Sequence, residues 1–119
     1  MSTLVIAVDD SSRTLTFSLT SGPTGATVGS SGDIDISACN EADIDLEWNL
    51  STGSFSTTGN AVTISGNGNN QVFGDPVLTN NNKTCTVSDS NPTNPSNSNF
   101  TYQIHEQNSQ FDPAIRNRS

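Results

Sequence analysis

Short segments in which hydrophobic and polar residues alternate run along most of this chain. In the segment at 13–19, Leu15, Phe17 and Leu19 alternate with polar residues, and an Asp/Ser turn joins this segment to the apolar run at 3–8. An alternation with a period of two is typical of a β-strand that buries one face. The two segments therefore predict a β-hairpin.

More strand-like segments follow, and loops rich in Gly, Asn, Ser and Pro separate them. These segments lie at residues 33–37, 43–50, 61–65, 72–78, 84–88 and 100–105. The stretch at 88–99 contains Pro92 and Pro95 and is interpreted as a linker, because proline cannot donate a hydrogen bond within a central strand. No segment keeps a sustained helical period.

The succession of many short strands and turn signals predicts an all-β fold. We expect residues 1–119 to form one single-domain antiparallel β-sandwich, immunoglobulin-like in its general architecture. Its last, short strand is expected at 114–117, within a C-terminal tail at 113–119.

Two of the expected strands carry acidic residues on one face, since side chains at alternate positions share a face. These residues are Asp33, Asp35, Asp43, Asp45 and Glu47. If the two strands are antiparallel neighbours, all of these carboxylates gather on one face of one hairpin. Two interpretations stay open: a solvated outer face, or a functional cluster that binds a cation or raises the pKa of one carboxyl group.

The chain has 119 residues, of which 30% are hydrophobic, and a formal net charge of -8. This length suits one domain with a thin core. The negative charge opposes binding to nucleic acid and to anionic membrane surfaces, so neither is expected as a partner. The apolar run at 4–8 is too short to span a bilayer and lacks the flanks of a secretory signal, so we expect a soluble protein and leave its localisation open.

Neither a metal site nor a cofactor is expected. His105 is the only histidine, and without a second histidine or a nearby cysteine pair it is expected to be a surface or half-buried strand residue. The acidic segments lack the Gly-containing loop and the distal Glu of an EF-hand. Cys39 and Cys85 leave two alternatives, a disulfide in an oxidising compartment or two buried thiols.

The bond between Asp112 and Pro113 has the chemistry needed for self-cleavage. An Asp carboxyl can attack its own main-chain carbonyl carbon and form a cyclic anhydride as the next nitrogen departs. The tertiary amide nitrogen of proline is more basic and more easily twisted than an ordinary peptide nitrogen, so it leaves more readily. A rigid alignment of carboxyl and carbonyl would supply an effective molarity of about 10⁵ to 10⁸ M.

Such a cleavage also needs a proton for the leaving nitrogen, or an activated water, near neutral pH. Asp33 and Asp35 are the candidates, because they begin a strand beside a flexible Gly/Ser loop. Asp-Pro is also a common turn dipeptide, and Asp75-Pro76 is a second example in this chain. Scission there would split the sandwich into two large pieces, whereas the tail released at Asp112-Pro113 could stay bound as a strand.

The C-terminal pattern, FTYQIHEQ at 100–107 followed by SQFDPAIRNRS at 109–119, resembles the DP-EP family of small β-sandwich proteins, described as self-cleaving Asp-Pro endopeptidases. The length and the acidic, Asn/Ser-rich character are also similar. The resemblance implies that the carboxyl group of Asp112 is released at the cut and that Pro113 becomes the N-terminus of the tail. It also implies a catalytic aspartate on an early strand, with Asp33 and Asp35 both matching.

Members of that family can trap the cleaved Asp as an isopeptide with a lysine. The only lysine here is Lys83, in the loop at 80–84, and none stands in the Asn/Ser linker where such a lysine is expected. The resemblance therefore makes Lys83 the cross-link candidate, and this departure from the pattern favours hydrolysis over cross-linking.

The leading hypothesis is thus a self-cleaving endopeptidase that cuts its own Asp112-Pro113 bond with help from a second aspartate. The alternative is a non-enzymatic acidic β-sandwich, a structural or binding module for self-assembly, calcium or carbohydrate. The expected partner is the chain's own C-terminal tail, whose Arg116 and Arg118 can dock on the acidic face of the same or a neighbouring molecule. Self-association by strand exchange is part of this hypothesis.

Overall fold

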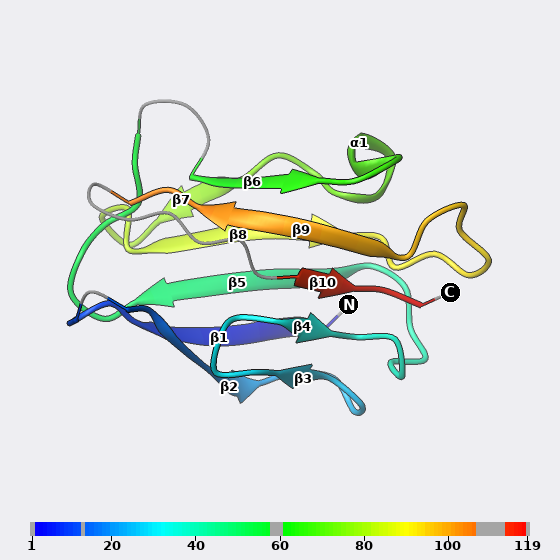
Figure 1. The fold of residues 1–119 in the computed structure, drawn as a ribbon, viewed down its shortest axis with the longest axis horizontal. Coiled ribbons are helices and arrows are strands. Elements are labelled where there is room, and N and C mark those ends of the chain that lie inside the picture. The colour runs from blue at the N-terminus through cyan, green and yellow to red at the C-terminus, as the bar shows by residue number, and fades with distance from the viewer. Residues whose placement is uncertain (1, 13, 58–60, 107–113, 119) are drawn as a thin grey trace.

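The computed structural model describes residues 2–12, 14–57, 61–106 and 114–118, which form a sandwich of two five-stranded sheets (Figure 1). The elements are β1 (Thr3–Asp9), β2 (Thr16–Ser21), β3 (Thr27–Val28), β4 (Ile34–Asp35), β5 (Ile44–Leu50), β6 (Val62–Ser65), α1 (Asn69–Val72), β7 (Val77–Thr79), β8 (Thr84–Asp89), β9 (Asn99–Ile104) and β10 (Ala114–Arg116). The all-β sandwich predicted from the alternating segments is confirmed.

The first sheet has the strand order β2-β1-β5-β8-β7. β1 and β2 pair antiparallel, which confirms the predicted hairpin. β5 lies on the other side of β1 and runs parallel to it, with Leu4 opposite Leu46 and Ile6 opposite Trp48. All four of these side chains are fully buried, because alternate residues of each strand point into the sandwich.

The second sheet has the order β3-β4-β10-β9-β6, so the C-terminal strand β10 lies at its centre (Figure 1, red). β10 runs parallel to β4, with Ile115 opposite Ile34, and antiparallel to β9, with Ala114 opposite Thr101. The expected last strand is therefore confirmed. Each sheet contains one parallel pair, so the sheets are mixed and not wholly antiparallel as expected. Alternation alone cannot reveal this, because it fixes faces and not strand directions.

The core lies between the sheets, and its largest side chains come from both of them. Trp48 of β5 and Tyr102 of β9 pack with ring centroids 5.1 Å apart. Cys39 and Cys85 are buried free thiols, which decides between the two alternatives left by the sequence. Burial raises the pKa of Cys85 to about 12, so this thiol is unreactive.

The expected hairpin of two acidic strands is wrong. β4 belongs to the second sheet, whereas β5 belongs to the first and pairs with β1 and β8. The connection between them buries Ile36 and Cys39 in the core as it crosses from one sheet to the other. The acidic residues of the two strands are therefore on different sheets. The single-turn helix α1 was also not predicted, because one turn is too short to show a helical period.

Candidate functional site

The Asp112-Pro113 bond lies outside the described residues, but the chain is described on both sides of it. Before the bond it is described up to Glu106, which follows β9 and bridges to Phe55. After the bond it is described from Ala114, the first residue of β10. The contacts of these two flanking residues define the candidate site.

Asp33 contacts the start of the C-terminal strand directly. Its Oδ1 accepts a hydrogen bond from the backbone N–H of Ala114 at 2.9 Å. Ala114 is the residue that follows Pro113. Of the two aspartates predicted to assist cleavage, Asp33 is thus the one that lies beside the tail, and its side chain is exposed to solvent.

Hydrogen bonds from residues of the second sheet hold the turn that carries Asp33. The N–H of Gly29 donates to the carbonyl of Asp33 at 2.8 Å, and the hydroxyl of Tyr102 donates to the carbonyl of Gly32 at 2.6 Å. Gly32 has a φ of 101°, a conformation that residues with a Cβ rarely adopt. The Tyr102 hydroxyl also accepts from Trp48 Nε1 at 3.3 Å. The buried aromatic pair therefore fixes the turn before β4.

The hydroxyl of Tyr102 remains protonated over the physiological pH range. Burial raises the pKa of Tyr102 well above its usual value, the hydrogen bond from Trp48 lowers it, and the nearby charge of Asp33 raises it again. Tyr102 is therefore a permanent hydrogen-bond donor to Gly32.

Replacing Tyr102 by phenylalanine is expected to lower the free energy of unfolding by about 1–3 kcal/mol, because the carbonyl of Gly32 and the indole N–H of Trp48 would lose a buried partner. Equilibrium urea denaturation measures this change. A Tyr102→Phe variant as stable as the wild type would contradict the role assigned to the hydroxyl.

Asp35 is engaged elsewhere. Its Oδ1 accepts hydrogen bonds from the N–H and the hydroxyl of Ser37, at 2.9 Å and 2.5 Å. Burial would raise the pKa of Asp35, but the bonds from Ser37 and the charge of Arg116 lower it below its usual value. Asp35 is therefore an ionised acceptor opposite Arg116. It lies farther from the start of the tail than Asp33 does, because Asp33 contacts Ala114.

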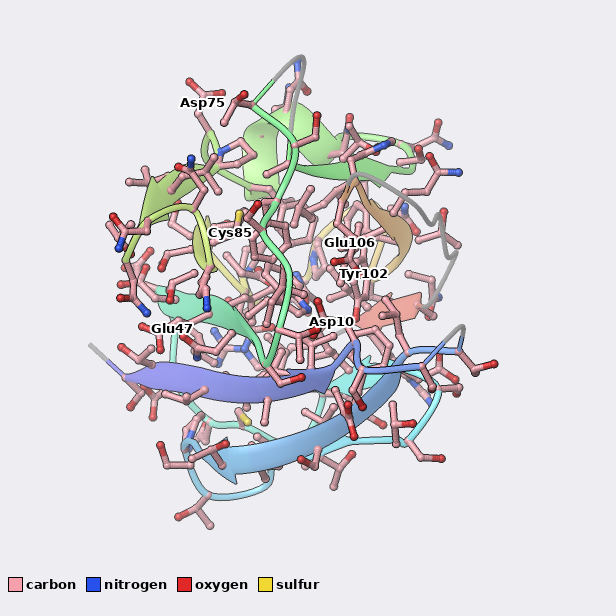
Figure 2. All side chains as sticks on the ribbon, turned by 90° about the vertical axis from the view of Figure 1, so that its left-hand side faces the viewer. Asp10, Glu47, Asp75, Cys85, Tyr102 and Glu106 are labelled. Carbon is pink, nitrogen blue, oxygen red and sulfur yellow. The ribbon has the colours of Figure 1, made fainter. Side chains whose placement is uncertain are left out.

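A second pair of acids lies where β9 ends. The side chains of Asp10, which follows β1, and Glu106, which follows β9, are hydrogen-bonded and so join the two sheets. Figure 2 looks onto this end of the sandwich and labels both residues. A Cβ at Gly53 would lie 2.7 Å from Asp10 Oδ2 and 2.8 Å from Glu106 Oε2, so a larger residue there would displace the two carboxyl groups.

Asp10 is ionised, and Glu106 keeps its proton at pH values below about 7. Burial opposes the ionisation of Asp10, but its carboxylate accepts from the N–H groups of Thr52 and Gly53, each at 2.7 Å, and from the hydroxyl of Ser51 at 2.8 Å. These bonds lower the pKa of Asp10 far below its usual value. Burial, together with the hydrogen bond and charge of Asp10, raises the pKa of Glu106 to about 7.

Sequence reasoning missed this acid pair. Glu106 continues the alternation of the buried residues Tyr102 and Ile104, so the available signal was a carboxyl group on the core face of a strand. Asp10 gave no such signal, because aspartate is a usual residue of turns.

The other predicted residues lie away from Asp33. Lys83 belongs to the turn between β7 and β8 of the first sheet, whereas β10 belongs to the second sheet. The role of Lys83 as cross-link candidate stays a prediction. His105 is half-buried, as expected, and its Nε2 lies 2.9 Å from Thr63 Oγ1. Asp75, in the second Asp-Pro dipeptide, is exposed just before the edge strand β7.

Within the described ranges, no group of three or more His, Cys, Asp or Glu side chains is placed to hold a metal ion. In that same part of the chain, no helix has the length and apolar character needed to cross a membrane.

The sequence matches no model of a known protein family and no curated protein. The resemblance of the C-terminal pattern to the DP-EP family therefore stays a hypothesis, and the geometry around Asp33, Asp10 and Glu106 is what bears on function.

Proposed function

We propose that this protein is a self-cleaving endopeptidase that cuts its own Asp112-Pro113 bond, with Asp33 as the assisting acid. The observation that carries the proposal is the hydrogen bond of 2.9 Å from the Ala114 N–H to Asp33 Oδ1. It places a second carboxyl group beside the residue that immediately follows the Asp-Pro dipeptide.

Two acids flank the segment that contains the bond, and their positions favour Asp33 over Glu106. Ala114 lies opposite Thr101, so Glu106 is farther along β9 by about 17 Å, at about 3.3 Å per residue. Asp33 is therefore the one of these two acids that contacts the first described residue after the bond.

The proposed reaction has two steps. The carboxylate of Asp112 attacks its own carbonyl carbon, the bond from that carbon to the nitrogen of Pro113 breaks, and the nitrogen takes up a proton. Water then opens the anhydride, which restores the side-chain carboxyl group of Asp112 and leaves a new C-terminal carboxyl group on the same residue. Asp33 either gives the proton in the first step or accepts one from the attacking water in the second. If Asp33 donates the proton, the cleavage rate should fall with rising pH, because the protonated form of Asp33 is lost. If Asp33 acts as the base, the cleavage rate should rise with pH.

The position of β10 supports retention of the product. β10 pairs with strands on both sides, β4 and β9, and its Ile115 is fully buried. A tail that begins at Pro113 would therefore stay in the sheet after cleavage, and the two chains would separate only under denaturing conditions.

The intact mass of the purified protein, measured under denaturing conditions after incubation between pH 4 and 8, tests the proposal. We expect a fragment ending at Asp112 and a tail beginning at Pro113. Asp112→Asn is expected to abolish cleavage, and Asp33→Asn to slow it by about 10²-fold or more, the scale of general acid–base catalysis.

Two matched variants serve as controls. Asp75→Asn removes the carboxyl of the other Asp-Pro dipeptide, and Asp35→Asn removes the neighbouring acid of β4; both are expected to leave the rate unchanged. A single full-length species at every pH would overturn the proposal and favour the non-enzymatic module, in which the Asp-Pro dipeptide only turns the chain into β10. Cleavage that is indifferent to Asp33→Asn would remove Asp33 from the mechanism.

A further inference from the structure

A separate polar cluster holds the C-terminal strand at its other end. Asp89 is the last residue of β8 in the first sheet, and Asn117 directly follows β10 in the second. Asn117 Nδ2 donates to Asp89 Oδ1 at 2.8 Å. Asp89 is 0% exposed and Asn117 1%, so this hydrogen bond crosses the interior of the sandwich.

Asn91 completes the cluster and extends it along the tail. Its N–H donates to Asp89 Oδ1 at 2.9 Å, and its own Oδ1 accepts from the N–H of Arg118 at 2.9 Å. Its carbonyl accepts from the Arg118 guanidinium through Nε, at 3.0 Å, and through the terminal nitrogen. The N–H of Asn117 donates to the carbonyl of Ser98 at 2.8 Å. The residues after β10 are therefore held largely by contacts outside the sheet ladder.

Two oxygen atoms of this cluster are buried without a hydrogen-bond partner among the described residues: Asp89 Oδ2 and Asn117 Oδ1. Both are acceptors when Asp89 is ionised, and a buried charged group with an unpaired oxygen is strongly disfavoured. A proton on Asp89 Oδ2 turns that oxygen into a hydrogen-bond donor. Asn117 Oδ1 is an acceptor without a donor partner among the described residues, so it can accept this bond. A carboxylic acid and a carboxamide can form two parallel hydrogen bonds, and one of the two is already present.

We propose that at mildly acidic pH Asp89 is protonated in the folded protein and forms a carboxylic acid–carboxamide pair with Asn117 that locks the C-terminal strand into the sandwich. The proton comes from solvent when the tail docks and returns to solvent when the tail leaves. The lock does not depend on whether the Asp112-Pro113 bond is cut, and so it stands apart from the proposed cleavage.

The electrostatics of this end of the sandwich agree with a neutral Asp89 below about pH 6. Burial raises the pKa of Asp89 to about 6, although the hydrogen bonds from Asn91 and Asn117 lower it. The titratable or charged groups near the cluster are Arg118 on the tail and Cys39, Glu41 and Asp43 in the connection before β5. None of these charges is among the causes of the shift, so burial and pairing decide the state of Asp89.

The lock is therefore expected to weaken as the pH rises. The pKa of Asp89 is 3.8 when the group is free and about 6 in the folded protein, so the stabilisation is complete below 3.8 and is lost as the pH rises through 6. Opening of the tail should become about tenfold more favourable between pH 5 and pH 8. Hydrogen exchange of the Asn117 amide, corrected for its intrinsic pH dependence, measures this opening.

Asp89→Asn is the decisive variant, because it places an amide N–H where the proposed O–H stands. At pH 8 its tail is expected to open about as rarely as that of the wild type at pH 5, with no change between the two pH values. Asp35→Asn is the matched control and is expected to keep the wild-type pH dependence at Asn117, since the Asp35 carboxylate is bonded to Ser37.

An NMR titration of the carboxyl carbon of Asp89 in the wild-type protein tests the same inference without any variant. A midpoint near pH 6 supports the lock. A midpoint at or below the ordinary value, or an Asp89→Asn tail that opens more readily than the wild-type tail at pH 8, would rule the lock out and would point instead to an ionised Asp89 bridged by a buried water molecule.

Discussion

Replacing Ile115 by alanine is expected to lower the free energy of unfolding by about 2–5 kcal/mol. Ile115 is 0% exposed and lies opposite Ile34 of β4 on one side and Phe100 of β9 on the other. The backbone of β10 keeps these two strands apart, so they cannot close over the cavity left by the lost side chain. Urea denaturation followed by circular dichroism measures the change.

Val77→Ala is the matched control for this substitution. Val77 is 57% exposed on the edge strand β7, so its truncation should change the stability by no more than about 0.5 kcal/mol. If Ile115→Ala were equally mild, β10 would not be a core strand, and the retention of a cleaved tail would lose its physical basis.

Replacing Asp10 by alanine is expected to lower the free energy of unfolding by about 2–4 kcal/mol at pH 7, because hydrogen bonds to a charged group are stronger than neutral ones. The carboxylate accepts from Ser51, Thr52 and Gly53, which belong to the loop after β5. The neighbouring Asp9 is the control: its exposed carboxylate bonds mainly to Ser11 within the same turn, so Asp9→Ala should lower the stability much less than Asp10→Ala.

The same substitution is expected to change the pH dependence of stability on both the acid and the neutral side. The lowered pKa of Asp10 gives a stabilisation that is present above its ordinary 3.8 and is lost as the pH falls below that value. The raised pKa of Glu106 gives a stabilisation that is present below its ordinary 4.5 and is lost as the pH rises through about 7. Denaturation curves from pH 3 to 8 should show both slopes flattened in Asp10→Ala, and unchanged slopes would contradict the pairing.

The sequence was sufficient to predict most of the strands, but it missed β3 and placed Val72 of α1 in a strand. Leu15 and Phe17 of the first hairpin and Ile115 of the last strand are buried as their alternation predicts, whereas Leu19 is 40% exposed. The sequence was not sufficient to predict which strands are neighbours, because pairing depends on long-range packing. The connection after β4 buries Ile36 and Cys39 in the core and enters the other sheet, and no local pattern in that connection signals the crossing.

The candidate site could be predicted only in part. Asp33 was a candidate because it begins a strand beside a Gly/Ser loop, and it does lie beside the tail. The same reasoning gave equal weight to Asp35, since the sequence does not reveal that the Asp35 carboxylate bonds to Ser37 and is stabilised by the charge of Arg116. Asp89 and Glu106 acquire their raised pKa values from burial and from partners far away in the chain, which only the fold brings together.

The central place of β10 also has a consequence for the order of folding. The contact between Asp33 and Ala114 joins residues 81 positions apart, so the loop that it closes costs chain entropy long before the new contacts can repay it. The second sheet is therefore expected to be completed late. Until then β4 and β9 are open edges that can pair with a strand of another molecule. Refolding at high protein concentration should therefore favour swapped dimers and aggregates, whereas refolding at high dilution should favour the monomer.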